Sequence, residues 1–352
     1  MMSETQMSNN NLLEVRGLKT YFFLDEGTVR AVEGADFEIK RGHTLGIVGE
    51  SGCGKSVTAQ SILQIVPSPG RIVEGEIFLH SKIWNAENNG ETTETVELTA
   101  LDPKGKEMRS IRGSEIAMVF QEPMTSLSPV HSIGNQITEA ILLHQDVSKE
   151  DAKDKAINML KRVGMPQPSQ TIDNYPHQLS GGMRQRVMIA MALSCHPSLL
   201  IADEPTTALD VTTEAQILDL MRGLQDDLGM AIMYITHDLG VIAEMADEVA
   251  VMYLGKVVER AEVDTLYYNP LHPYTKALLR SIPRIGRKER LESIKGMVPD
   301  PYSRPKGCPF NPRCPERGGP ECRTEGPPWI EVEPGHWIRC HKGLELKSRQ
   351  SG

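Results

Sequence analysis

Residues 12–48 contain short apolar runs separated by turn residues, a pattern that predicts a β-rich segment. Three runs have the continuity and length of buried strands: 45–48, 199–202 and 231–235. Two segments carry apolar residues at helical spacing: 150–163 and 213–228. Because strands alternate with helices along the chain, we expect an α/β fold with a mostly parallel sheet.

Three stretches depart from this alternation. Residues 83–106 are polar, with glutamates among Asn, Gly and Thr, and we expect a solvated surface insertion there. The segment of about 123–186 is interpreted as a helical insertion into the core. Beyond Pro270 prolines become frequent and apolar periodicity fades. We therefore expect a main domain over residues 12–270 and a smaller C-terminal extension over residues 271–352.

Composition and charge restrict the classes of function. The 352 residues are 39% apolar, which is enough for a substantial core, and the net charge is −9. An acidic chain lacks the basic surface of a nucleic-acid binder, so we expect no nucleic-acid partner. No apolar run approaches the ~20 residues of a membrane span, and the polar N-terminus lacks a signal region. We expect a protein on the cytoplasmic side that reaches a membrane only as a peripheral partner.

A glycine-rich loop follows the run at 45–48. Residues 49–56 read Gly-Glu-Ser-Gly-Cys-Gly-Lys-Ser, which fits the P-loop pattern between a strand and a helix. Backbone N–H groups of such a loop can hold phosphate oxygens, Lys55 can reach the β- and γ-phosphates, and Ser56 can bind Mg²⁺. A chance glycine-rich turn would lack the flanking strand and helix. The nucleotide-binding residues expected here are Gly49, Ser51, Gly52, Cys53, Gly54, Lys55, Ser56 and Val57.

Two carboxylates end the apolar run at 199–202. Asp203 and Glu204 would lie at the carboxyl edge of the sheet, where open α/β sheets bind ligands. We expect Asp203 to hold Mg²⁺ and Glu204 to accept a proton from the attacking water. A strand that ends in Asp-Glu is by itself usually a solvated strand end. The P-loop in the same chain favours the catalytic interpretation.

The segment 179–186, Leu-Ser-Gly-Gly-Met-Arg-Gln-Arg, resembles the signature motif of ABC-type ATPases. It precedes the apolar segment 187–193, so it should begin a helix whose N-terminus presents hydrogen-bond donors to an anion. The chain resembles an ABC nucleotide-binding domain over residues 12 to about 270. This resemblance implies an ABC-type P-loop core with an antiparallel β subdomain and a helical subdomain.

The same resemblance assigns further roles. Gln121 resembles the Q-loop glutamine, a Mg²⁺ ligand, and residues 207–210 with Asp210 resemble the D-loop. His237 resembles the switch histidine that contacts the γ-phosphate, and Phe22 the aromatic that stacks on adenine, although Tyr21 and Phe23 flank it and a core aromatic is an open alternative. The implied catalytic residues are Lys55, Gln121, Glu204 and His237. The residues implied to reach the ATP of a second subunit are Ser180, Gly181 and Gly182.

Three features resemble the oligopeptide and dipeptide importers: the wording of the P-loop, residues 120–127 and the segment Leu-His-Pro-Tyr-Thr-Lys at 271–276. The resemblance implies ATP hydrolysis coupled to peptide uptake at the cytoplasmic face of the membrane. The implied partners are a second homologous ATPase in a heterodimer, two membrane permeases and, indirectly, an external solute-binding protein. This chain resembles the cysteine-rich member of the ATPase pair.

Other functions stay open at this point. Related importers carry nickel or other small solutes, and substrate choice lies outside the ATPase. A soluble ABC ATPase acting on ribosomes or DNA repair complexes is less consistent with one P-loop, an acidic chain and no heptad stretch. A non-catalytic subunit is inconsistent with the intact Glu204, His237 and signature motif.

Four of the six cysteines, Cys308, Cys314, Cys322 and Cys340, lie in the C-terminal tail. A cytoplasmic setting disfavours disulfides, so the alternatives are four buried thiols or a metal cross-link. Zinc sites usually contain closely spaced cysteine pairs, absent here, whereas an iron–sulfur cluster tolerates wider spacing. Ligand type leaves both open, and the family resemblance favours a [4Fe–4S] cluster. His336 and His341 are alternative ligands or surface residues.

Overall fold

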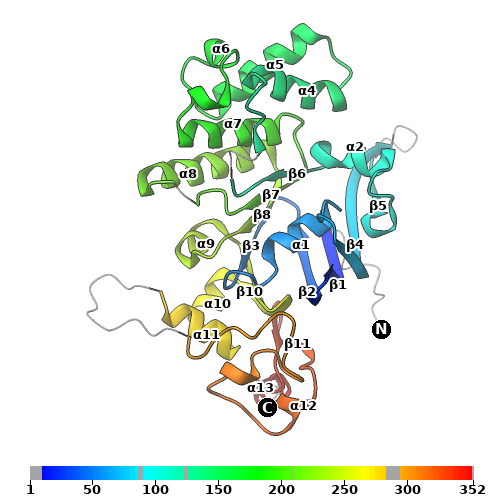
Figure 1. Cartoon of the computed structure of the whole chain (residues 1–352), viewed down its shortest axis with the longest axis vertical. Coiled ribbons are helices and arrows are strands. Elements are labelled where there is room, and N and C mark those ends of the chain that lie inside the picture. The colour runs from blue at the N-terminus through cyan, green and yellow to red at the C-terminus, as the bar shows by residue number, and fades with distance from the viewer. Residues whose placement is uncertain (1–9, 86–89, 123–125, 208, 283–293, 351–352) are drawn as a thin grey trace.

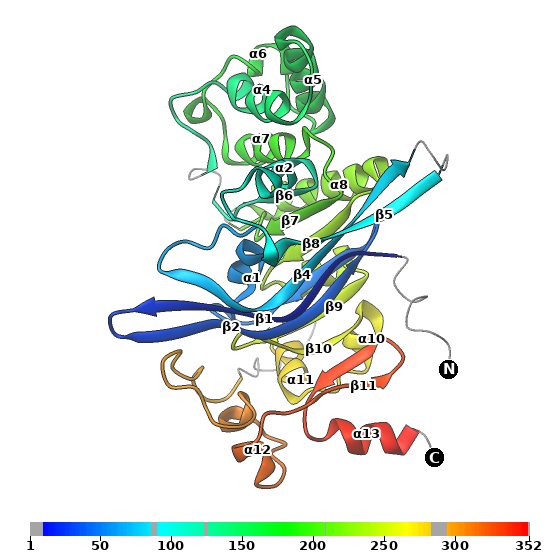
Figure 2. The ribbon, with the colours of Figure 1, turned by 90° about the vertical axis from the view of Figure 1, so that its right-hand side faces the viewer.

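The computed structural model describes residues 10–85, 90–122, 126–207, 209–282 and 294–350. Figures 1 and 2 show three tiers along the long axis. The helical segment 133–193 lies at one end, two sheets lie in the middle, and the segment after residue 270 lies at the other end. None of the helices in the described ranges is both long and apolar enough to cross a bilayer.

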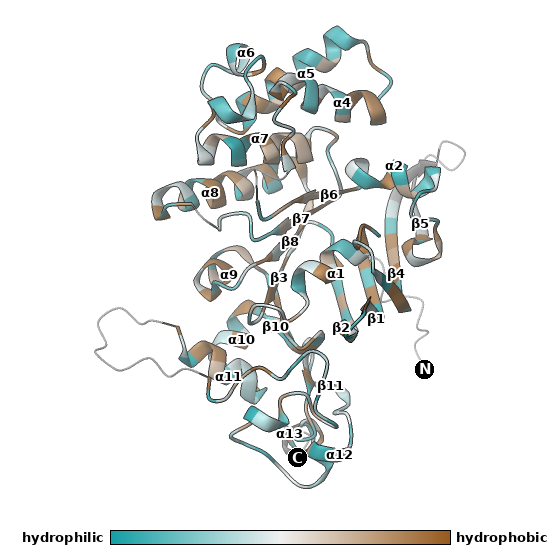
Figure 3. Cartoon of the chain, viewed as in Figure 1, coloured by the Kyte–Doolittle hydropathy of each residue, from teal (hydrophilic) through white to brown (hydrophobic). Residues whose placement is uncertain are grey.

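The larger sheet has eight strands in the order β11-β12-β10-β9-β3-β8-β7-β6. In chain order they are β3 (Thr44–Val48), β6 (Ile116–Val119), β7 (Leu199–Asp203), β8 (Ala231–Ile235), β9 (Glu248–Tyr253), β10 (Lys256–Glu262), β11 (Trp329–Glu333) and β12 (His336–Arg339). The pairings among β6, β7, β8, β3 and β9 are parallel, and the remaining pairings are antiparallel. Every residue of β3, β7 and β8 is buried, which explains their continuous apolar runs. Figure 3 shows these central strands as hydrophobic. The predicted mostly parallel α/β core is confirmed.

The smaller sheet is antiparallel, with the order β2-β1-β4-β5. Its strands are β1 (Asn11–Leu24), β2 (Gly27–Lys40), β4 (Gly70–Asn85) and β5 (Gly90–Glu97). The expectation of a solvated surface insertion over 83–106 is therefore wrong in part. Residues 90–97 pair with β4, and Leu98 directly after them is fully buried. The Thr-rich stretch has the β-branched residues that a pleated strand favours, despite its glutamates.

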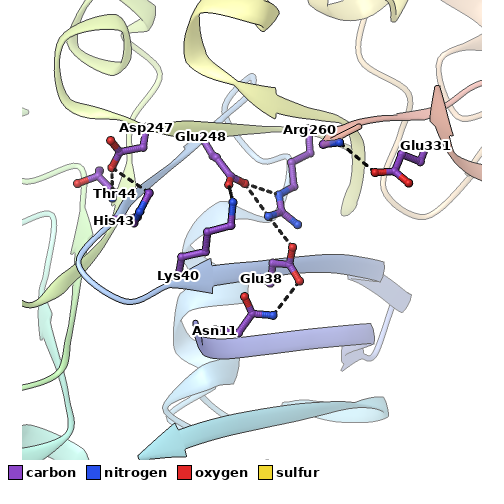
Figure 4. Close-up of polar contacts among 10 residues, drawn as sticks. Asn11, Glu38, Lys40, His43, Thr44, Asp247, Glu248, Arg260 and Glu331 are labelled. Carbon is purple, nitrogen blue, oxygen red and sulfur yellow. Dashed lines mark hydrogen bonds and ion pairs between the residues drawn. The ribbon is translucent and has the colours of Figure 1, made fainter. Parts of the chain in front are cut away.

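An ion-pair network joins the two sheets (Figure 4). The carboxylate of Glu248 at the start of β9 accepts hydrogen bonds from Lys40 and from Arg260, whose Nη2 lies 2.6 Å away. Arg260 also donates to Glu38 at 3.0 Å, and Glu38 accepts from the Asn11 amide at 3.0 Å. The start of β1 and the end of β2 are thus held next to β9 and β10.

Some helices cover the sheets, and those within residues 133–193 form the helical tier at one end of the molecule. The helices are α1 (Lys55–Ile62), α2 (Lys106–Ser114), α4 (Ile133–His144), α5 (Lys149–Arg162), α6 (Pro168–Thr171), α7 (Gly181–Leu193), α8 (Val211–Leu228), α9 (Leu239–Met245), α10 (Val263–Tyr268), α11 (Pro273–Arg280), α12 (Glu321–Thr324) and α13 (Gly343–Gln350). The helices predicted over 150–163 and 213–228 correspond to α5 and α8. Ser148 caps α5 by accepting from the Asp151 N–H, and Gly229 ends α8 in the left-handed conformation.

The segment after residue 270 is packed on the core. Strand β12 pairs with β10, so the β11–β12 hairpin continues the larger sheet. Beneath it the fully buried carboxylate of Glu259 accepts from the Leu271 and His272 N–H groups, at 2.6 and 3.0 Å. The Nε2 atom of His336 lies 2.8 Å from Glu259, and His336 is 1% exposed. The expectation that His336 is a metal ligand or a surface residue is therefore wrong, because its ring is buried against Glu259.

Candidate functional site

An open cavity of about 560 Å³ lies where parallel strands of the larger sheet end. Strand β3 leads into the P-loop, β6 into Gln121, β7 into Glu204 and β8 into His237. The lining residues are Ala31, Ser51, Gly52, Gly54, Lys55, Ser56, Val57, Gln121, Glu204, Thr207 and His237. The carboxyl edge of a parallel sheet thus brings together side chains that are up to about two hundred residues apart, as the sequence predicted.

The P-loop presents backbone donors to this cavity. Gly54 has φ of +104°, and a Cβ atom there would lie 2.4 Å from the carbonyl oxygen of Ala31, so only glycine fits. Gly54 is also the N-cap of α1, and it makes no side-chain capping bond. The first N–H groups of α1 therefore face the cavity without a side-chain acceptor, which suits an anionic group such as phosphate.

Lys55 lies inside the loop and is 6% exposed. Its ammonium group donates to the carbonyl oxygens of Gly49 at 2.9 Å and Glu50 at 3.4 Å. A buried ammonium whose hydrogen bonds go to backbone carbonyls favours an added negative charge close by. This arrangement fits the predicted contact between Lys55 and phosphate.

Two oxygen-bearing side chains that could bind Mg²⁺ lie together beside the loop. The hydroxyl of Ser56 donates to Oδ1 of Asp203 at 3.0 Å. Burial raises the pKa of Asp203, while the hydrogen bond from Ser56 opposes this rise. A buried carboxylate beside a hydroxyl is a donor set that Mg²⁺ accepts. The third expected ligand, Gln121, lies on the rim of the same cavity.

Glu204 is the point on which the cavity's polar side chains converge. Its carboxylate accepts hydrogen bonds from Nε2 of Gln121 and from Oγ1 of Thr207, both at 3.1 Å. The Nδ1 atom of His237 lies 3.5 Å from the other carboxylate oxygen. These three residues come from three separate loops. A carboxylate held in this way at the cavity wall can accept a proton from a water bound in the cavity.

Several predicted residues do not line this cavity. Ser180 caps α7 by accepting from the Met183 N–H, and Asp210 caps α8 by accepting from the Thr213 N–H. Gly181 and Gly182 lie at the start of α7, beside α8 and away from α1 (Figure 1). The segment 179–186 therefore lies outside the cavity that the P-loop of the same chain lines.

The remaining predicted residues lie at the border of the cavity or behind it. Gly49, Cys53 and Asp203 are not part of its lining, and Cys53 is 4% exposed. Burial raises the pKa of the Cys53 thiol, so the thiol is a neutral packing group. The ring of Phe22 packs against Gly70, where an added Cβ would be 2.6 Å from it. Adenine stacking by Phe22 stays a prediction.

Three residues of the site were not predicted from the sequence. Ala31 and Thr207 line the cavity, and the hydroxyl of Tyr274 accepts from the Glu50 N–H at 2.9 Å. Thr207 belongs to the segment 207–210 that resembles the D-loop, but the resemblance assigns it no role. Nothing in a single sequence relates Ala31 or Tyr274 to a loop so far away in the chain, because these contacts depend on strand register and on the docking of α11.

The four tail cysteines line a second, small cavity of about 20 Å³, together with His341 and residues of α11 and the tail. All four are free thiols. Burial raises the pKa of Cys308 to about 11, and it also raises the pKa of Cys314 and of Cys340. Four thiols around one cavity fit the donor set of a thiolate-bound centre. Within the described ranges, however, no three His, Cys, Asp or Glu side chains are arranged to hold a single metal ion.

Comparisons with known proteins agree with this geometry. The profile of the ABC transporter family matches residues 32–207, and that of the oligopeptide/dipeptide transporter C-terminal region matches residues 258–322. The oligopeptide transport ATP-binding protein AppD of Bacillus subtilis (strain 168) is 52% identical over 309 residues, which cover 87% of this chain and 89% of AppD. The dipeptide transport ATP-binding protein DppD of Escherichia coli (strain K12) is 47% identical over 305 residues, covering 86% and 88%.

Solved structures share the fold. The dimeric post-hydrolysis state of the ATP-binding cassette MJ0796, bound to ADP and Pi, has a TM-score of 0.60 and 26% identity, covering 72% of this chain and 99% of that one. The structure of cbiO1 from Clostridium perfringens has a TM-score of 0.58 and 28% identity, covering 74% and 92%. Both correspond to the predicted ABC-type core. The chain therefore belongs to the ABC transporter family, as one of its ATP-binding, ATP-hydrolysing subunits.

Proposed function

We propose that this chain couples ATP hydrolysis to the uptake of di- or oligopeptides. The observation that carries the proposal is the match over most of the chain to proteins named for oligopeptide and dipeptide transport, in which the C-terminal region takes part. The cavity supports the ATPase half of this proposal, because P-loop donors, Ser56 and the candidate base Glu204 line it, and Asp203 lies next to it, within hydrogen-bond distance of Ser56.

Different residues of the chain bind the phosphates, hold the metal ion and accept the proton. The P-loop, from Gly49 to Ser56 and on to Val57, binds and orients the phosphates, with Lys55 at the β- and γ-phosphates. Ser56, Asp203 and Gln121 would hold Mg²⁺, which would neutralise phosphate charge when bound. Glu204 accepts the proton of the attacking water, while Gln121 and His237 orient that water and the γ-phosphate. Phe22 stacks on adenine.

The remaining proposals concern the assembly. Ser180, Gly181, Gly182 and Asp210 complete the site of a second, homologous ATPase subunit in a heterodimer. The pair binds two permease subunits at the cytoplasmic face of the membrane, and an external solute-binding protein delivers the peptide. Within the chain, residues 12–270 form the nucleotide-binding domain, about 123–186 its helical subdomain, and 271–352 the extension.

Reconstitution tests this function. The chain would be purified with its partner ATPase and permeases in liposomes, and ATPase activity would be measured with peptide-loaded and with empty solute-binding protein. We expect peptide to stimulate hydrolysis and labelled peptide to accumulate inside, and the Lys55→Ala complex to do neither. Stimulation by nickel or another solute but not by peptide would leave the ATPase role intact and contradict the peptide assignment. Co-purification with ribosomes instead of permeases would contradict a role in transport of any solute.

We also propose that Cys308, Cys314, Cys322 and Cys340 hold a [4Fe–4S] cluster, with zinc as the alternative. The proposal is supported by the four thiols that line one cavity although they are spread over the tail. The role is structural, since nothing in ATP hydrolysis requires an electron. A bound centre would join the segment that begins at Cys308 to the loop after β12.

Metal analysis of anaerobically purified protein tests this second proposal. We expect brown protein with broad visible absorption and about four iron atoms per chain. Cys308→Ser should lose the colour and lower the melting temperature of the chain, while Cys195→Ser, outside the tail, should keep the colour. Colourless protein with one zinc per chain would decide for zinc, and metal-free wild-type protein of full stability would contradict both.

A further inference from the structure

The C-terminal extension contacts the P-loop directly. Both terminal nitrogens of the Arg313 guanidinium donate to the carboxylate of Glu50, at 2.7 and 3.0 Å. The Arg313 side chain is 3% exposed, whereas that of Glu50 is 27% exposed. A two-bond arginine–carboxylate contact fixes both the position and the orientation of its partner. Because Glu50 is the second residue of the P-loop, the contact lies one residue from the cavity lining.

Arg313 is held rigidly on the extension side. It ends the short 3₁₀ helix Asn311–Arg313, and its Nε donates to the Lys295 carbonyl at 3.3 Å. Phe310, just before this helix, is 1% exposed and packs against Tyr253 and Tyr274, with ring centroids 5.2 and 5.4 Å apart. The guanidinium therefore reaches Glu50 from a packed aromatic cluster rather than from a free loop.

Glu50 connects the extension to the phosphate site through its backbone hydrogen bonds. Its N–H donates to the Tyr274 hydroxyl at 2.9 Å, so the extension holds its backbone as well as its carboxylate. Its carbonyl oxygen accepts from the Cys53 N–H at 3.2 Å and from the Lys55 ammonium at 3.4 Å. One face of Glu50 thus contacts the extension, and the other contacts the groups that receive phosphate.

We propose that Arg313 is a positioning residue for nucleotide binding, which holds Glu50 and through it the P-loop and Lys55 in the conformation that receives the phosphates. A loop that is already ordered loses less conformational entropy when ATP binds. The inference rests on the P-loop as the phosphate site. The extension is accordingly a working part of the nucleotide site.

A double-mutant cycle on the full chain tests the proposal. Calorimetric titration with Mg-ATP would compare wild type, Arg313→Gln, Glu50→Gln, the double variant and the conservative Arg313→Lys. Arg323→Gln is the matched control, because Arg323 is an exposed arginine of the same extension. We expect Kd to rise about tenfold in each single Gln variant, as expected for lost hydrogen bonds between charged groups. The double variant should be no weaker than the weaker single variant.

Two further readouts separate positioning from a general loss of structure. Arg313→Lys, which keeps the charge, should recover part of the affinity, and Arg323→Gln should bind as wild type. In the reconstituted complex the KM for ATP should rise while kcat at saturating ATP stays within about twofold, since ground state and transition state use the same loop. If Arg313→Gln does not fold, Glu50→Gln carries the test alone.

Three results would overturn the inference: an unchanged Kd in the Gln variants, losses that add in the double variant, or a kcat that falls as much as the affinity. Lys55→Ala keeps this failure distinct from failure of the P-loop assignment. If Lys55→Ala abolishes binding while Arg313→Gln has no effect, the site is correct and the positioning role is wrong. If neither changes binding, the phosphate site itself lies elsewhere and the inference falls with it.

Discussion

At the scale of single residues, Glu204 combines an unusual backbone with a dense set of contacts. Its φ of +47° lies in the left-handed region, which non-glycine residues rarely adopt. The surroundings hold it there, because the Glu204 N–H donates to the Ile235 carbonyl at 2.9 Å and its carbonyl accepts from the Thr207 N–H at 3.2 Å. This conformation directs the carboxylate toward Gln121 and His237 instead of along the strand direction of β7. Backbone strain of this kind is typical of functional positions.

The first prediction concerns Glu204→Gln in the reconstituted complex. Glutamine keeps the shape and most hydrogen bonds of the side chain but cannot accept the proton of the attacking water. We expect hydrolysis to fall by roughly 10²–10⁴ while ATP affinity stays near the wild-type value, so that the closed, ATP-bound dimer accumulates. Single-turnover hydrolysis and a nucleotide-binding titration measure the two effects.

Lys55→Ala is the contrasting variant for that experiment. It removes the ammonium that the loop carbonyls hold beside the phosphate site, so its main effect should be on ATP affinity. Equal ATP affinities in the two variants would contradict the division of roles between Lys55 and Glu204.

The candidate residues were predictable where the chemistry is local in sequence. The P-loop is one continuous segment, and Asp203 and Glu204 follow a buried strand directly, so each motif identifies its own neighbours. Contacts such as Tyr274 with Glu50 depend on how α11 packs, which no local pattern encodes. The burial of His336 against Glu259 belongs to the same class, because a polar residue in a Pro-rich tail gives no sign of its partner.

At the level of secondary-structure elements, ion pairs connect strands of the two sheets. Glu248 on β9 pairs with Lys40 at the end of β2 and with Arg260 on β10, as Figure 4 shows. The side chain of Arg260 is 9% exposed and that of Glu248 is 14% exposed. Water therefore screens the attraction between their charges only weakly. These contacts hold the antiparallel sheet against the larger one, in addition to the apolar cluster that the two sheets share.

The second prediction concerns the pH dependence that this network gives. Burial alone would raise the pKa of Glu248, but Arg260 and Lys40 together hold it below its ordinary value. A lowered folded-state pKa means that the stabilisation is complete above the ordinary pKa of about 4.5 and is lost as the pH falls through the folded-state value. Glu248→Gln should lower the free energy of unfolding by about 1–3 kcal/mol at pH 7 and by less at pH 4.

Urea unfolding at the two pH values measures this difference. Glu76→Gln is the control, since Glu76 is an exposed glutamate of β4. A loss of stability in Glu248→Gln that is the same at pH 7 and pH 4 would contradict the assignment of this pH dependence to Glu248.

Elements were predictable to the extent that one pattern dominated them. Strands β3, β7 and β8 are buried on both faces and therefore stand out as apolar runs. Strand β5 is rich in Glu and Thr, and β11 and β12 are short and only partly buried. None of the three shows a strong alternation of apolar and polar residues. Their pairing partners, β4 and β10, supply the order that their own sequences do not specify.

At the scale of the whole molecule, the P-loop and the signature motif are far apart. The P-loop lies beside α1 in the middle tier, and the signature begins α7 in the helical tier (Figures 1 and 2). The cavity lining contains neither Ser180 nor the two signature glycines. If Ser180 and the signature glycines bind phosphate as proposed, one chain presents two half-sites, and each lacks the donors that the other carries. A second, similar subunit placed head to tail would complete both.

We propose that the active sites of this ATPase form between two subunits, and the concentration dependence of its hydrolysis rate tests this. The ATPase rate per chain would be followed through a dilution series, first for the chain alone and then with its partner ATPase and permeases. We predict a low rate for the isolated chain that falls further on dilution, and a rate at least about tenfold higher in the assembled complex. Full-rate hydrolysis that is independent of concentration, by a chain proven to be monomeric, would contradict the account.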